Sequence, residues 1–147
     1  MSRFPYRGAT HLFLLREGEI LLSRRFNTGF MDGYYSVPAG HIDGGETARE
    51  CIVRESREEI GIEVRSTDLE MVHVMHRYSD EEIIYIDFFV TSREHAGEIR
   101  NCEPEKCDEL SWHPLDALPA NTIPYIRRAI EAMQRKELYS EFGWEKR

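Results

Sequence analysis

Three glutamates near the middle of the chain have the spacing that metal-dependent chemistry requires. Glu55, Glu58 and Glu59 stand at positions i, i+3 and i+4, so a helix would bring their side chains together on one surface. Carboxylate oxygens suit Mg²⁺, which completes its shell with waters and substrate phosphates. The spacing therefore indicates a divalent-metal site, and the alternative is a solvated helix face rich in Glu and Arg.

The residues on either side of the glutamates predict the helix that positions them. Thr47 and Glu50 form a capping box, in which each side chain accepts a hydrogen bond from a backbone N–H at the helix start. Gly61 ends the helix, because glycine adopts the left-handed C′ conformation with little strain. We therefore expect a helix over 48–60, with an apolar stripe that docks on the core beside the carboxylates.

A glycine-rich loop with the sequence PAGHIDGG, over 38–45, leads directly into this helix. The backbone of such a loop approaches a metal or a phosphate closely, because glycine carries no side chain to keep the ligand away. We expect Gly40, inside this loop, to help hold substrate phosphate. The loop and the helix together favour a binding site over a solvated charge run.

The stretch 40–62, GHIDGGETARECIVRESREEIGI, resembles the Nudix box of the MutT-like pyrophosphohydrolases. Two positions depart from the usual pattern: Ser56 replaces an aliphatic residue, and Ala39 stands where many members have a second glycine. Ser56 can bond back to the carbonyl of Ile52, and Ala39 still offers its carbonyl as a metal ligand. The matching positions are Gly40, Glu46, Arg54, Glu55, Glu58, Glu59, Gly61 and Ile62.

This resemblance implies roles for the charged residues of the box. The three helix glutamates match the carboxylates that bind Mg²⁺ or Mn²⁺. Arg54 matches the arginine that orients Glu55, and Glu46 braces the joint between the loop and the helix. One of the box carboxylates, Glu55 or Glu58 among them, or a carboxylate from the later loop deprotonates the attacking water.

The later loop, 97–109, is the expected source of a further carboxylate. Glu105 is the first choice for an extra metal ligand or base, ahead of Glu103 and Glu109. Metal bound at such a site would neutralise charge on the phosphates and lower the pKa of a bound water.

Four further residues bear on substrate contact or on the class of substrate. Arg24 and Arg25 follow a β-rich run and contact either substrate phosphate or solvent. Trp112 borders a base pocket or belongs to the core. Tyr78 lies 16 residues past Ile62, a spacing associated with Nudix members that cleave dinucleoside polyphosphates.

The rest of the 147-residue chain predicts one domain, 1–147, of the α/β class. The order of elements suits an α/β/α sandwich with a mixed β-sheet, which the resemblance to Nudix proteins also implies. An aromatic tail over 138–144 packs either on the body or on a second subunit of a homodimer. We expect strands over 11–15, 19–23, 34–37, 70–78, 83–91 and 109–113, and a second helix over 124–136.

The composition of the chain limits which binding partners and which cellular compartment we expect. A net charge of −8 argues against a nucleic-acid-binding surface. Three cysteines without a C-x-x-C pair indicate free thiols in a reducing compartment. No run of about 18 apolar residues is present, so we expect a cytoplasmic protein without a membrane segment.

The family resemblance implies hydrolysis of a nucleoside diphosphate linked to another moiety. Compact members are often nucleoside triphosphate pyrophosphohydrolases, so we expect a (deoxy)nucleoside triphosphate to yield a monophosphate and pyrophosphate. One alternative is a dinucleoside polyphosphate hydrolase. The other is a non-catalytic nucleotide-binding module, a class that usually loses box carboxylates, whereas this chain keeps them all.

Overall fold

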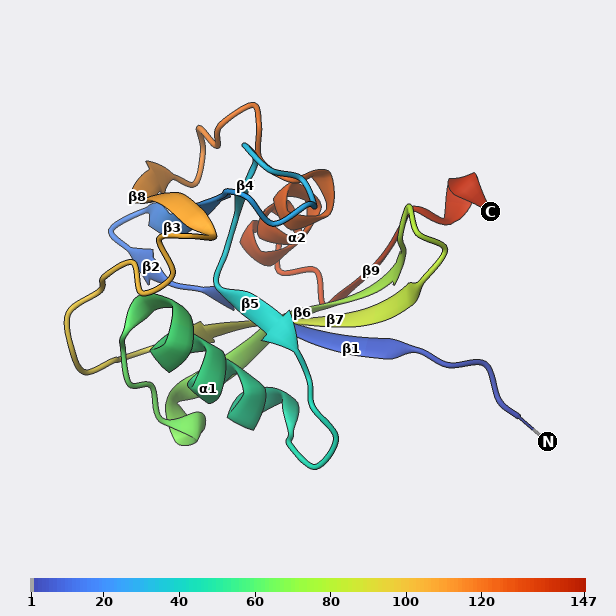
Figure 1. Cartoon of the computed structure of the whole chain (residues 1–147), viewed down its shortest axis with the longest axis horizontal. Helices are drawn as coiled ribbons and strands as arrows, with labels where there is room; N and C mark the ends of the chain where they lie inside the picture. Colours follow the sequence, from blue (N-terminus) through green and yellow to red (C-terminus); the bar gives the residue numbers. More distant parts are fainter. Residues whose placement is uncertain (1) are drawn as a thin grey trace.

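The computed structural model describes residues 2–147, and within them the strands form a five-stranded and a four-stranded sheet (Figure 1). The strands are β1 (Arg7–Phe13), β2 (Leu15–Arg16), β3 (Glu19–Arg25), β4 (Tyr35–Ser36), β5 (Ala39–His41), β6 (Leu69–Tyr78), β7 (Ile84–Ser92), β8 (Cys107–Pro114) and β9 (Tyr139–Phe142). The helices are α1 (Ala48–Ile60) and α2 (Pro124–Gln134), with short 3-10 turns η1 (Ser66–Asp68) and η2 (Trp144–Lys146).

The five-stranded sheet has the order β5-β1-β7-β6-β9 and is mixed. β1 runs parallel to β7, and β6 runs parallel to β9. The β6–β7 and β1–β5 pairs are antiparallel. The second sheet pairs β3 with β2, β4 and β8, each antiparallel. The chain crosses between the sheets at Leu14, whose carbonyl accepts a hydrogen bond from the Leu21 N–H at 3.0 Å.

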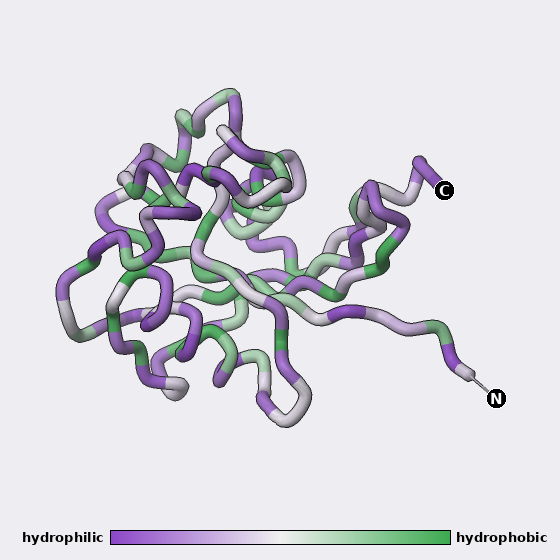
Figure 2. The backbone as a smooth tube through the Cα atoms, viewed as in Figure 1, coloured by the Kyte–Doolittle hydropathy of each residue, from purple (hydrophilic) through white to green (hydrophobic). Residues whose placement is uncertain are grey.

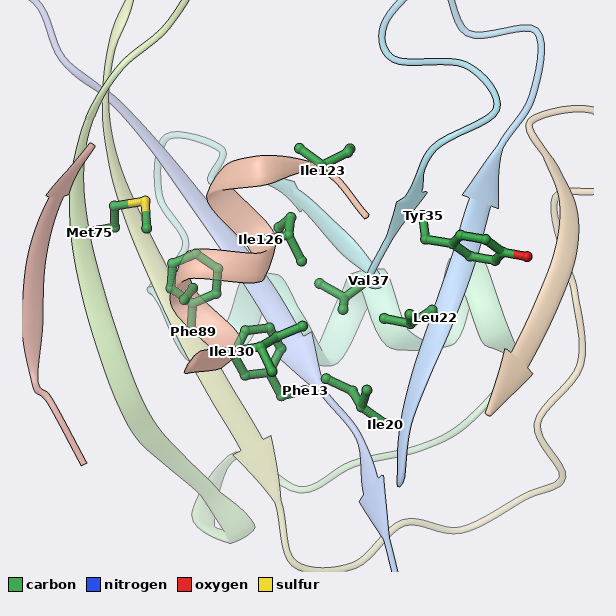
Figure 3. Close-up of a cluster of buried hydrophobic side chains, with 11 residues drawn as sticks. Phe13, Ile20, Leu22, Tyr35, Val37, Met75, Phe89, Ile123, Ile126 and Ile130 are labelled. Carbon is green, nitrogen blue, oxygen red and sulfur yellow. The ribbon is translucent and has the colours of Figure 1, made fainter. Parts of the chain in front are cut away.

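Successive side chains along a strand point to opposite faces of the sheet, and this alternation divides the core into two clusters, one on each face. Leu12 and Val90 belong to the cluster under α1, whereas their chain neighbours Phe13 and Phe89 belong to the cluster under α2. Figure 1 shows α1 and α2 on opposite sides of the central sheet, and Figure 3 shows apolar side chains of α2 packed over the strands. The predicted α/β/α sandwich with a mixed sheet is confirmed.

The helix α1 begins and ends where the sequence predicts. The Thr47 side chain accepts from the Glu50 N–H at 3.1 Å, and the Glu50 carboxylate accepts from the Thr47 N–H at 2.9 Å. Gly61 follows with φ 72°, in the left-handed region. Hydrophilic and hydrophobic colours mix along α1 in Figure 2, as expected for a helix with one face on the core.

Three edge features differ from the sequence prediction. β1 begins at Arg7, because Arg7 already pairs with Tyr85 of β7. β5 was not expected, and it exists because β1 supplies its pairing partner. The tail forms β9 beside β6, and the Trp144 indole N–H donates to the His76 carbonyl at 2.9 Å. Of the two alternatives for the tail, packing on the body is the one observed.

Two expectations from composition concern the described part of the chain. Cys51, Cys102 and Cys107 are free thiols, as predicted. Across residues 2–147, no helix is both long enough and apolar enough to cross a membrane.

Candidate active site

α1 and the strand-like loop before it enclose a cavity of about 540 Å³. The remaining walls come from the end of β3, the loop after it, and the segment 101–107. Seven of the residues predicted for metal or substrate line this one cavity: Arg24, Arg25, Ala39, Gly40, Glu55, Glu58 and Glu59. Residues from four separate parts of the chain therefore meet at the cavity beside α1, the helix that carries the glutamates of the predicted metal site.

Packing of α1 fixes where its carboxylates lie. Ile52, Ser56 and Ile60 are buried on the core side of the helix. The Ser56 hydroxyl donates to the Ile52 carbonyl at 2.6 Å, so this unusual box residue is satisfied inside the helix, as predicted. The glutamates consequently lie at the rim of the buried face, where they border the cavity.

Arg54 joins the carboxylates into one network. Its Nη1 donates to Glu55 at 2.7 Å and to Glu58 at 3.3 Å, and its Nη2 donates to Glu46 at 2.7 Å. Glu46 also accepts from the Asp43 N–H at 2.9 Å, so it connects the loop to the helix. The hydrogen bond from Arg54 lowers the pKa of Glu46 to about 2. This geometry supports the orienting role expected for Arg54 and the bracing role expected for Glu46.

Negative charge accumulates around Glu59, the most enclosed of the three carboxylates. Burial raises the pKa of Glu59 well above its ordinary value, and the neighbouring charges of Glu55 and Glu103 raise it further. The Ala39 N–H, which donates to Glu59 at 2.9 Å, offsets only part of this effect. Burial also raises the pKa of Glu55, although its bond with Arg54 opposes the shift.

The residues present fit a divalent cation in their chemistry. Carboxylates of Glu55, Glu58, Glu59 and Glu103 and the backbone of Ala39 provide hard oxygen ligands beside one cavity. The upward shift in the pKa of Glu59 is one that a bound cation would oppose. In the arrangement described for residues 2–147, no three His, Cys, Asp or Glu side chains converge as ligands. The Arg54 guanidinium instead binds Glu55 and Glu58 of this set through hydrogen bonds of 2.7 and 3.3 Å.

The loop carboxylate at the cavity is Glu103 and not Glu105. Glu103 is half-buried and lines the cavity, whereas Glu105 is exposed and lies outside the lining. The cause is a turn in which the Glu103 carbonyl accepts from the N–H groups of Lys106 and Cys107. The turn places Glu105 at its exposed tip, and the order of preference for these two residues is reversed.

The two arginines of β3 reach the cavity but already have partners. Arg24 donates to Asp108 at 2.7 Å. Arg25 donates to the Phe30 carbonyl at 2.7 Å and to Thr28 at 3.0 Å, and so holds the loop after β3. Lys106 also lines the cavity, and sequence analysis did not identify it because its loop position depends on the turn at Glu103.

Two aromatic candidates lie elsewhere. Trp112 borders a second cavity, where the Arg16 guanidinium lies 4.1 Å from its ring centroid. Tyr78 stacks near Trp144, with 5.4 Å between ring centroids, at the far end of β6. Neither residue lines the carboxylate cavity.

Comparison with known proteins agrees with this geometry. The family model of the NUDIX domain matches residues 5–133. The chain therefore belongs to the Nudix family.

Relatives with assigned activities are longer proteins. The NAD-capped RNA hydrolase NudC of Pseudomonas aeruginosa is 32% identical over 120 residues, which are 81% of this chain and 40% of that protein. NudC of Pseudomonas entomophila is 33% identical over 124 residues, which are 82% of this chain and 42% of that protein. The chain spans about two fifths of the length of these relatives.

Solved structures share the architecture over nearly the whole chain. The MutT NUDIX hydrolase from Burkholderia pseudomallei is 26% identical, with a TM-score of 0.79 over 87% of this chain and 98% of that chain. The MutT protein from Methanosarcina mazei Go1 is 22% identical, with a TM-score of 0.77 over 92% and 98%. The second likeness concerns the fold alone.

Proposed function

We propose that the carboxylate cavity hydrolyses the pyrophosphate bond of a nucleoside triphosphate, releasing a monophosphate and pyrophosphate. The observation that carries this proposal is the convergence of Glu55, Glu58, Glu59 and Glu103 on one cavity beside Gly40. The volume of about 540 Å³ lies in the range of small-molecule sites. Loss of the box carboxylates would favour a non-catalytic module, and all are retained.

Mg²⁺, or Mn²⁺ in its place, would be held by Glu55, Glu58 and Glu59 with the Ala39 carbonyl and Glu103. When bound, such an ion neutralises phosphate charge and lowers the pKa of a water ligand. A net charge of −8 would repel a polyphosphate substrate. A bound divalent cation offsets that repulsion at the site, which explains how an acidic chain could bind an anionic substrate.

The chain's own groups divide the remaining work. Glu55 is our candidate for the base that takes the proton of the attacking water, because its carboxylate lines the cavity directly beside Gly40. Arg54 holds the Glu55 carboxylate in place through the 2.7 Å hydrogen bond. Glu103 replaces Glu105 as the loop carboxylate that assists.

In this proposal the substrate phosphates are bound by two kinds of group, the backbone at Gly40 and positively charged side chains. Gly40 lets the backbone approach them closely, since it presents no side chain to the cavity. Lys106, Arg24 and Arg25 supply positive charge in the lining of the same cavity. Holding the phosphates in line is a large part of catalysis for transfers of this kind.

A panel of nucleotides with Mg²⁺ tests the proposal, with products identified by mass. The panel holds (d)NTPs, oxidised dGTP, diadenosine polyphosphates, ADP-ribose and 5′-triphosphate RNA. Glu58→Gln is the inactive control, and Glu70→Gln, an exposed glutamate on β6, is the matched control. If the unmodified chain binds a nucleotide yet turns over no candidate faster than Glu58→Gln, the binding-module alternative is correct.

A second candidate reaction is cleavage of a pyrophosphate that links two nucleotides. The relatives named NAD-capped RNA hydrolase favour it, since they share 32–33% identity over most of this chain. Dinucleoside polyphosphates belong to the same class of substrate. NAD and NAD-capped RNA therefore join the panel, and release of two mononucleotides from either would select this candidate over the triphosphate reaction.

A further inference from the structure

A second cavity, larger than the first, lies on the α1 side of the smaller sheet. Its volume is about 830 Å³, which is within the range of sites for small ligands. Its walls come from β2, β3, β8 and the segment 92–101. None of the groups assigned to hydrolysis above lines it, so its chemistry is unused by the proposed reaction.

The walls of this cavity combine an aromatic surface with positive charge. Trp112 lies there with the Arg16 guanidinium 4.1 Å above its ring, an arrangement in which a planar cation stacks on an indole. Arg93 and Arg100 add two exposed guanidinium groups, and Arg93 also pairs with Asp68 at 3.5 Å. The Arg100 Nε donates to Cys102 Sγ at 3.3 Å, and no ion pair among residues 2–147 engages Arg100.

The acidic residues of the cavity are largely occupied. Asp108 accepts from Arg24, and Glu109 accepts from Tyr35 and Ser111. Glu98 is the remaining acid of the lining, against Arg16, Arg93 and Arg100. The lining therefore carries three guanidinium groups and three carboxylates, and Arg100 is the one arginine of this lining that makes no ion pair within residues 2–147.

The two cavities are neighbours and are joined through the backbone. Asn101 and Leu110 line both of them. The segment between them is tied to the end of α1, because the Arg100 N–H donates to the Ile60 carbonyl and the Cys102 N–H donates to the Glu59 carbonyl, each at 3.0 Å. A ligand in the second cavity would thus contact the segment that is hydrogen-bonded to the end of α1.

We propose that the second cavity binds a phosphorylated nucleoside, with its base stacked on the Arg16–Trp112 pair and its phosphate held by Arg100 and Arg93. Bases stack on aromatic rings and on guanidinium planes alike, and arginine forms strong charge-assisted hydrogen bonds to phosphate. The ligand is either the far half of a substrate whose phosphates lie in the carboxylate cavity, or a separate nucleotide. If the ligand is the far half of a substrate, the inference rests on the proposed function; if it is a separate nucleotide, the inference does not.

Binding is tested with AMP in EDTA, by the fluorescence of Trp112 in Trp144→Phe, which leaves one tryptophan of the two. We expect saturable quenching that weakens about tenfold or more in Arg16→Gln/Arg100→Gln, as expected for losing charged partners of a phosphate. Arg135→Gln, an exposed arginine after α2, is the matched control and should leave binding unchanged. Equilibrium dialysis of AMP against the unmodified chain gives a second readout without the tryptophan substitution.

Kinetics then distinguish the two sources. If the ligand is the far half of a substrate, Arg16→Gln/Arg100→Gln raises KM for diadenosine tetraphosphate about tenfold and leaves KM for ATP unchanged. If the ligand is a separate nucleotide, AMP binding weakens in the variant while both KM values stay the same.

The inference is wrong if AMP neither quenches Trp112 nor is retained in dialysis at millimolar concentration. It is also wrong if Glu58→Gln abolishes AMP binding and Arg16→Gln/Arg100→Gln preserves it, since AMP then occupies the carboxylate cavity. Absence of any hydrolysis would remove the proposed function, yet the AMP titration would still decide this site.

Discussion

The carboxylate of Glu55 lies directly against the Cα of Gly40. A methyl group built on Gly40 would stand 2.2 Å from Oε1 of Glu55, closer than any real contact allows. The clash falls on the end of a flexible side chain and not on backbone, so the side chain yields. Glycine at this position therefore keeps the proposed base in place.

Gly40→Ala should lower turnover more than it lowers stability. We expect kcat to fall about 10²-fold, because a displacement of about 1 Å at a catalytic group has an effect of that size. Thermal denaturation should show a small change in Tm. Gly44→Ala is the matched control, since a Cβ there meets nothing within 4 Å. Equal kcat values for the two variants would show that the contact with Glu55 is unimportant.

Glu59→Gln should change stability in a pH-dependent way in metal-free protein. The pKa of Glu59 is raised in the folded state, so the folded state binds the proton more tightly than the unfolded state does. The resulting stabilisation is present at acidic pH and is lost as the pH rises through the folded-state pKa. The variant carries no such charge, so its Tm should exceed that of the unmodified chain at neutral pH and approach it at about pH 4, the ordinary range of a carboxyl.

Mg²⁺ should reverse this difference. A cation that binds only the folded state raises Tm as its concentration rises, and Glu59→Gln removes one proposed ligand. We expect Mg²⁺ to raise Tm of the unmodified chain and to leave the variant nearly unchanged. A Tm difference that is constant with pH and with Mg²⁺ would contradict the role given to Glu59.

Asp87→Asn should destabilise the fold strongly. Asp87 is fully buried in β7 and accepts hydrogen bonds from Arg77, the closer at 2.6 Å, and interacts with His11 at 3.1 Å. Burial raises the pKa of Asp87, but the hydrogen bonds outweigh it, so the net shift is downward and the group is a charged partner.

Removing one member of a buried ion pair leaves the other charge unpaired, which costs about 3–5 kcal/mol. Urea denaturation should show a loss of this size for Asp87→Asn. Asp80→Asn, which removes an exposed partner of Lys146, should change the free energy of unfolding by about 1 kcal/mol or less. A similar small loss for both variants would mean that Arg77 finds another partner.

Local signals in the sequence predicted α1 and its carboxylates well. The capping box and Gly61 act within one turn of the helix, so no distant contact is needed to locate its ends. The partners of the buried Asp87 carboxylate, His11 and Arg77, come from other strands and so depend on the fold.

Features that depend on distant partners were not predictable in the same way. Glu103 faces the cavity because of a turn closed by Lys106 and Cys107, and the sequence alone did not separate it from Glu105. The edge strands β5 and β9 exist through pairing with β1 and β6. Trp112 lies at the second cavity because β8 pairs with β3, a contact between segments about 90 residues apart that periodicity does not reveal.

We propose that the glutamates at the carboxylate cavity hold a divalent cation and serve the hydrolysis of a nucleotide pyrophosphate bond. The most direct test is the rate of product release from a nucleotide as Mg²⁺ is titrated, for the unmodified chain, Glu58→Gln and Glu70→Gln. We expect no turnover without Mg²⁺, saturation as Mg²⁺ rises, and a loss of about 10²-fold or more in Glu58→Gln alone, as for removal of a group acting in proton transfer or metal binding. Turnover that is independent of Mg²⁺, or that is equal in all three proteins, would contradict the claim.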